Sequence, residues 1–138
     1  TFRAMDESWR TRAHELITEY AVNLVKSMGA EIELLIDKGY PSVYNNEQLH
    51  EIAKHAATEY LGPGNIEETE LRMGAEDFGY YAQQVPACFY RIGVMNKQKG
   101  IVSGVHTPTF NIDEDAIEIG MGIMAWLGAS ATVPGVST

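Results

Sequence analysis

The sequence contains one cysteine, few basic residues and none of the short motifs that mark common cofactor sites. Cys88 has no second cysteine to pair with in the 138 residues, so an intrachain disulfide is excluded. Ten Lys and Arg face 19 Asp and Glu, and the net charge of −9 argues against a nucleic-acid-binding protein, which needs a basic face. No Gly-rich phosphate loop, CxxC pair or HExxH pattern is present. With 45% hydrophobic residues the chain is still apolar enough to fold.

A membrane span is not expected either. Residues 119–138 carry no charge over 20 residues, but only Ile119–Ala129 is densely apolar, and serine, threonine and proline dilute the rest. This stretch is therefore interpreted as a buried helix followed by a loose tail. We expect a protein without membrane association, and a cytoplasmic location.

The first 40 residues show the pattern of a strand, a helix and a second strand. Thr1–Met5 resembles a strand, Asp6 can cap a helix that Gly29 ends, and apolar and mostly charged residues alternate in Glu31–Asp37. Such a unit is half of a split βαβ layer. The Gly-Tyr-Pro-Ser turn that begins at Gly39 marks a domain boundary near Tyr40. Because the chain begins inside an apparent strand without an initiator Met, we expect it to be a fragment of a longer protein.

The remaining residues predict further alternation of helices and strands. The expected elements are a helix over Asn46–Leu61, a short strand over Ile66–Thr69, a short helix over Glu76–Gln84, a strand over Ala87–Val94, a long loop over Met95–Asn111 and a buried helix opened by Asp113-Glu114-Asp115. This order indicates an α/β fold class.

His106 is the strongest candidate for chemistry. It lies late in the long loop, is followed by Pro108 and precedes the apolar helix, so a rigid loop can present its imidazole as a metal ligand or general base. A purely structural histidine remains an equal alternative. The other histidines lie in charged or mixed helical patterns typical of surfaces: His14, His50 and His55.

Other candidates are weaker by themselves. The stretch Gly74-Ala75-Glu76-Asp77 allows backbone amides to approach a ligand, although Glu76 and Asp77 could merely cap the next helix. Arg3 could offer a bidentate guanidinium to a carboxylate, or could simply face solvent. Asn45 could contact a ligand, with helix capping the more ordinary role for the Asn45-Asn46 pair. Cys88, in an apolar run, is interpreted as a small core residue rather than a nucleophile.

Taken in order, these pieces resemble the C-terminal part of the metal-dependent amidohydrolases of the aminoacylase/carboxypeptidase family, which includes hippurate and auxin-conjugate hydrolases. The resemblance covers nearly the whole chain. It rests on the order of Thr1-Phe2-Arg3, Gly39-Tyr40-Pro41, Asn45, Gly74-Ala75-Glu76-Asp77-Phe78, Val85-Pro86 and His106-Thr107-Pro108-Thr109-Phe110-Asn111-Ile112-Asp113-Glu114.

The resemblance implies specific roles. His106 would be the last ligand of a pair of divalent metal ions, usually zinc and otherwise manganese or cobalt. Arg3 would grip the substrate carboxylate. Asn45 and the Gly74–Asp77 loop, where the family usually has a second glycine in place of Ala75, would line the pocket for an N-acyl amino acid or peptide. Residues 1–40 would be the second half of an α+β lid domain that commonly forms homodimers, and residues 41–138 the C-terminal part of an α/β catalytic domain.

The resemblance also implies that the general base and the remaining metal ligands lie upstream of Thr1, so the fragment alone is expected to be inactive. A catalytic zinc needs about three protein ligands. The alternative hypothesis is a non-catalytic α/β module for ligand binding or dimerisation. Such a module would have no need for a proline-braced His106 ahead of a buried helix.

Overall fold

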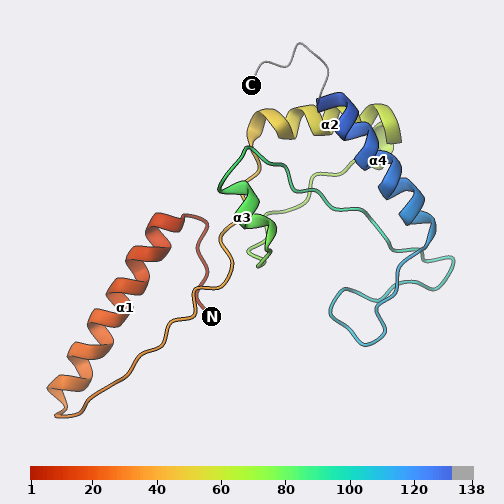
Figure 1. The fold of residues 1–138 in the computed structure, drawn as a ribbon. Coiled ribbons are helices and arrows are strands. Elements are labelled where there is room, and N and C mark those ends of the chain that lie inside the picture. Colours follow the sequence, from red (N-terminus) through yellow and green to blue (C-terminus); the bar gives the residue numbers. More distant parts are fainter. Residues whose placement is uncertain (132–138) are drawn as a thin grey trace. The chain divides into compact units, whose positions relative to one another are not determined.

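The computed structural model describes residues 1–131, and all of its regular elements there are helices (Figure 1). The elements in chain order are α1 (Glu7–Ser27), α2 (Glu47–Leu61), the 3₁₀ helix η1 (Pro63–Asn65), α3 (Phe78–Ala82) and α4 (Asp115–Ala131). The chain divides into two compact units. Unit 1 combines Thr1–Asn45 with Thr69–Ala87, and unit 2 combines Asn46–Glu68 with the chain from Cys88 onward. The loose tail expected after the last helix lies outside the described residues.

The predicted α/β fold class is wrong for the part of the chain that the structure describes. Within residues 1–131 there is no strand, and pairing is limited to one isolated antiparallel bridge between Asn96 and Ile101. The apolar alternation of Glu31–Asp37 marks one face of an extended segment, but a strand exists only where a second segment satisfies its backbone groups. The predicted strand–helix–strand arrangement of residues 1–40 therefore reduces to α1 followed by an extended segment.

The prediction of α1 is confirmed because its signals are local. Asp6 accepts a hydrogen bond from the backbone nitrogen of Trp9 at 2.8 Å, which caps the helix, and Gly29 follows its end with φ +78°. The hydrogen bond from Ser8, followed by the one from Trp9, lowers the pKa of Asp6. His14, expected on the surface, is instead half-buried and packs edge-on against Phe2, with ring centroids 6.3 Å apart.

The turn after residue 38 is held against the start of α1 by polar contacts within unit 1. The Arg10 guanidinium donates to the carbonyls of Lys38 at 3.1 Å and Tyr40 at 2.8 Å. Glu7 pairs with Arg10 at 2.5 Å and also accepts the backbone N–H of Ser42 at 2.7 Å. Glu7 and Arg10, which pair with each other, thus hold the chain at the point where the sequence predicts a domain boundary. The assignment of residues 1–40 and 41–138 to two domains stays a prediction.

The same turn packs on α3. The rings of Tyr40 and Tyr80 lie edge to face, with centroids 6.0 Å apart and an interplanar angle of 82°. Gly79 is buried, and a Cβ atom added to it would lie 2.5 Å from the Pro41 carbonyl oxygen. Glycine is required at this position because Pro41 offers backbone, rather than a flexible side chain, at the contact.

Replacement of Gly79 by alanine should therefore destabilise the protein despite alanine's better helix propensity. We expect a loss of about 1–3 kcal/mol in the free energy of unfolding, as for overpacked cores. Urea denaturation of the full-length protein measures it. Gly93→Ala is the matched control, because an added Cβ there meets nothing within 4 Å. Equal midpoints for the two variants would show that Gly79 does not touch Pro41 so closely.

Unit 2 is built on the packing of α2 against α4 (Figure 1). Tyr60 stacks on Trp126 with ring centroids 6.3 Å apart and reaches the backbone of α4 at Gly122, where a Cβ would overlap its hydroxyl. Ala56 and Ile123 are buried at 2% and 3% exposure. The lack of a side chain at Gly122 is what lets the aromatic ring approach the helix.

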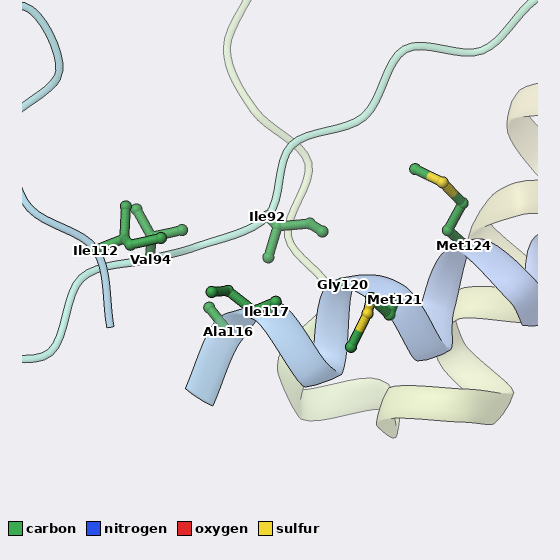
Figure 2. A pocket seen from close by; sticks show the side chains of 8 residues that line it. All are labelled: Ile92, Val94, Ile112, Ala116, Ile117, Gly120, Met121 and Met124. Atoms are coloured by element: carbon green, nitrogen blue, oxygen red, sulfur yellow. The ribbon is translucent and has the colours of Figure 1, made fainter. Parts of the chain in front are cut away.

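The expectation that the apolar helix α4 is buried all round is wrong. Met121 and Met124 keep about two thirds of their surface exposed, at 64% and 65%, and Ile119 keeps 45%. The reason is geometric: α2 covers one side of the helix only. The opposite side forms an open apolar pocket with the extended segment before the long loop (Figure 2). The pocket is lined by Ile92, Val94, Ile112, Ala116, Ile117, Gly120, Met121 and Met124.

None of the helices in residues 1–131 combines the length and the hydropathy that a transmembrane span requires.

Candidate active site

The sequence-predicted site residues fall into both units of the structure. Unit 1 contains Arg3, Asn45 and the loop Gly74–Asp77, and unit 2 contains His106.

Arg3 and the Gly74–Asp77 loop lie together in unit 1. The Arg3 Nη1 donates to the carbonyl oxygen of Met73 at 2.6 Å, across 70 residues of sequence. Met73 directly precedes Gly74, so the guanidinium lies at the entry of the loop. One of its five N–H donors is used in this hydrogen bond. The sequence order could not have indicated the contact, because no local pattern links positions so far apart.

Helix capping does not fully account for the acidic pair at the end of this loop. In the described residues Asp77, at the N-cap of α3, makes no capping hydrogen bond with its side chain. Glu76 accepts the backbone N–H of Phe78 at 3.5 Å, the outer limit of a hydrogen bond. By contrast, Asn46 caps α2 by accepting from the Leu49 nitrogen at 3.0 Å. The capping role of the Asn45-Asn46 pair therefore belongs to Asn46.

His106 has the least usual backbone conformation in residues 1–131. Its φ of +64° makes it the one non-glycine residue of that range in the left-handed region. The loop around it is closed by side-chain hydrogen bonds: Thr107 Oγ1 donates to the Gly104 carbonyl at 2.8 Å, and the hydroxyls of Ser103 and Thr109 lie 2.8 Å apart. Such strained residues cluster at functional sites, where the surrounding structure enforces them.

A charged network that the sequence did not single out lies at the base of this loop. Lys99 Nζ donates to Asp113 and to Asp115 at 2.6 Å each, and Asn96 donates to the second oxygen of Asp113 at 2.5 Å. The hydrogen bond from Lys99, then that from Asn96, holds the pKa of Asp113 below its ordinary value. Asp113 and then Asp115 raise the pKa of Lys99. The Asn-Lys-Gln-Lys-Gly turn ahead of an acidic helix start is the signal that could have indicated this network.

These residues do not by themselves form a metal centre. Across residues 1–131 no three His, Cys, Asp or Glu side chains are grouped so that they could hold a metal ion. His106 can supply one nitrogen donor, whereas a catalytic zinc needs about three protein ligands.

Cys88 is not placed for nucleophilic chemistry. The thiol is partly buried, and this burial raises its pKa, which disfavours the thiolate that a nucleophile requires. The structure thus favours a packing role for Cys88.

The chain is similar to known hydrolases. The model of "Peptidase family M20/M25/M40" matches residues 8–127, so the chain belongs to this peptidase family. The resemblance to amidohydrolases and carboxypeptidases is thereby confirmed. Peptidases of the family generally use divalent metals. No solved structure is significantly similar to the chain.

Named relatives are found in plants and archaea. IAA-amino acid hydrolase ILR1-like 6 of Arabidopsis thaliana is 33% identical over 91% of this chain and 28% of its own length. IAA-amino acid hydrolase ILR1-like 5 of the same plant is 32% identical over 92% of this chain and 30% of its own. Thermostable carboxypeptidase 1 of Saccharolobus solfataricus is 29% identical over 87% of this chain and 30% of its own. The chain thus spans less than a third of the length of these relatives.

Proposed function

We propose that these residues belong to a metal-dependent amidohydrolase that cleaves the amide bond of N-acyl amino acids or small peptides. The observation that carries the proposal is the left-handed φ of +64° at His106, inside a hydrogen-bonded loop of a chain in a peptidase family. Backbone strain of this kind clusters at active sites and ligand clamps, where the surrounding structure enforces it. The relatives' names, IAA-amino acid hydrolase and carboxypeptidase, support hydrolysis of amino-acid conjugates or peptides as the proposed reaction.

In this proposal each of the candidate residues has its own role. His106 supplies one ligand to a divalent metal, with zinc as the proposed ion and two ions as the proposed number. Arg3 binds the substrate carboxylate, and the Gly74–Asp77 loop, with Asn45, forms part of the pocket wall. The bound metal would supply electrophilic activation. The general base and the other metal ligands are proposed to come from outside these 138 residues. Residues 1–40 are proposed to belong to a lid domain through which the intact protein forms a homodimer.

Amide hydrolysis by the full-length protein tests this function. We expect turnover of N-acetyl and N-benzoyl amino acids or of dipeptides, loss of turnover after dialysis against 1,10-phenanthroline, and its return when Zn²⁺ is added. Ester analogues of the same substrates measure whether the reaction is general acyl transfer. Absence of turnover on every acyl amino acid and dipeptide in zinc-loaded protein would overturn the amidohydrolase. Turnover that persists in protein shown by elemental analysis to be metal-free would overturn the metal requirement.

A further inference from the structure

The His106 loop of unit 2 is closed at its base by a lysine that the proposed function does not use. The loop leaves the turn Asn96–Ile101 and returns to the chain at Asp113, just before α4. Both ends of the turn are joined by reciprocal backbone hydrogen bonds of 2.9 Å between Asn96 and Ile101. On the return side, the Asp113 nitrogen donates to the Val94 carbonyl at 2.9 Å. The two stems of the loop are therefore already adjacent.

Lys99 links these stems by its ammonium group. The side-chain oxygen of Asn96 accepts hydrogen bonds from the backbone N–H groups of Gln98 at 3.0 Å and Lys99 at 3.2 Å. These bonds fix the backbone of the turn from which the Lys99 side chain extends. The ammonium then lies between Asp113 and Asp115 at 2.6 Å from each. Asp113 is the one buried polar or charged residue among residues 1–131, at 9% exposure. A buried carboxylate needs a charged or hydrogen-bonding partner, and Lys99 and Asn96 satisfy both of its oxygens.

The closure at the base restricts the conformations of the rest of the loop. Holding the ends of a loop together reduces the number of conformations that the residues between them can adopt. Further in, the hydroxyls of Ser103 and Thr109 form a second link at 2.8 Å, and His106 is at the tip with a left-handed backbone. A strained conformation persists only where neighbouring contacts enforce it, so the two links together hold the backbone at His106 and restrict where its imidazole can reach.

We propose that Lys99 and Asp113 are positioning residues that fix the loop presenting His106 for catalysis. This proposal rests on the proposed function only for its effect on the reaction; its effect on the loop stands on the contacts of unit 2. Neither residue touches the reacting atoms in this account. Their role is to keep the His106 imidazole at a fixed distance from the start of α4, so that binding a ligand does not have to order the loop first.

The test compares Lys99→Met with Lys97→Met in the full-length protein. The two lysines lie in the same turn, but only the first has a salt bridge to Asp113, so the second controls for loss of one surface charge. We expect Lys99→Met to raise amide hydrogen exchange across residues 102–111 and to broaden or shift the His106 ring resonances, assigned with a His106→Asn sample. Lys97→Met should change neither. In turnover, we expect kcat to fall roughly tenfold, the lower end of what supporting contacts of a ligand contribute, with KM nearly constant.

Two further variants separate positioning from general stability. Lys99→Arg retains the charge and should restore most of kcat. The double variant Lys99→Met, Asp113→Asn should lose little more than either single variant, because the two residues act as one unit. Unchanged exchange and unchanged His106 resonances in Lys99→Met would overturn the proposal, whether or not the protein hydrolyses amides. A loosened loop with unaltered kcat would overturn the link to catalysis, and additive losses in the double variant would show that Lys99 does not act through Asp113.

Discussion

Replacement of His106 by alanine in the full-length protein is expected to lower kcat/KM for N-acyl amino acids by more than about 100-fold. Loss of a group that only supports a metal-bound histidine typically costs about 10–100-fold, and a direct ligand should cost more. Bound zinc per protomer should fall in the same variant. Both quantities are measurable on one preparation, by steady-state kinetics and by elemental analysis after dialysis.

The backbone conformation of His106 supplies matched controls for this experiment. Glycine accepts a φ of +64° without strain, so His106→Gly should lose activity while keeping or gaining stability. His106→Val places a β-branched residue in the left-handed region and should lower the free energy of unfolding by roughly 1–2 kcal/mol. A His106→Gly variant that keeps wild-type turnover and metal content would contradict the ligand role. His106 would then have only a structural role in the loop.

The helices were predictable because their signals lie within a few residues. Asp6 and Asn46 cap α1 and α2 as their side-chain chemistry requires, and Gly62 ends α2 with φ +83°. The strands were not predictable in the same way. Alternation in Glu31–Asp37 identifies an apolar face, but pairing depends on a partner segment that the pattern does not contain, and residues 1–131 provide none. The sequence therefore predicted local order well and the sheet wrongly.

The candidate site shows the same division between local and long-range information. The His106 loop was predicted from residue types in one stretch, because proline and small residues mark a rigid connection. The contact of Arg3 with Met73 was not, since it joins positions 70 residues apart. Lys99 was missed for a different reason. A lysine in a polar turn is usually a solvated residue, and only the structure reveals that two aspartates from the far side of the loop meet it at 2.6 Å.

Replacement of Arg3 by methionine should raise KM by about 10- to 100-fold for substrates that end in a free carboxylate. Hydrogen bonds to charged groups contribute roughly 1.5–3 kcal/mol, and each 1.4 kcal/mol corresponds to a tenfold change in binding. Within residues 1–131 the guanidinium donates from Nη1 to the Met73 carbonyl, so most of its five N–H donors stay available for a substrate. Arg3→Lys keeps the positive charge but cannot bind a carboxylate with two parallel N–H groups, so it should give an intermediate KM.

The carboxylate-binding role of Arg3 can be distinguished from a role in holding the Gly74–Asp77 loop by changing the substrate instead of the protein. If Arg3 binds the substrate carboxylate, an acyl amino acid amide, which has no free carboxylate, should be turned over equally by wild type and Arg3→Met. If Arg3 serves only to hold Met73 and the loop that follows it, the variant should lose activity on both substrates by the same factor. Equal losses on the acid and the amide would therefore reject the carboxylate clamp. A loss on the acid alone would support the carboxylate clamp and would show that the hydrogen bond from Arg3 to Met73 is not needed for turnover.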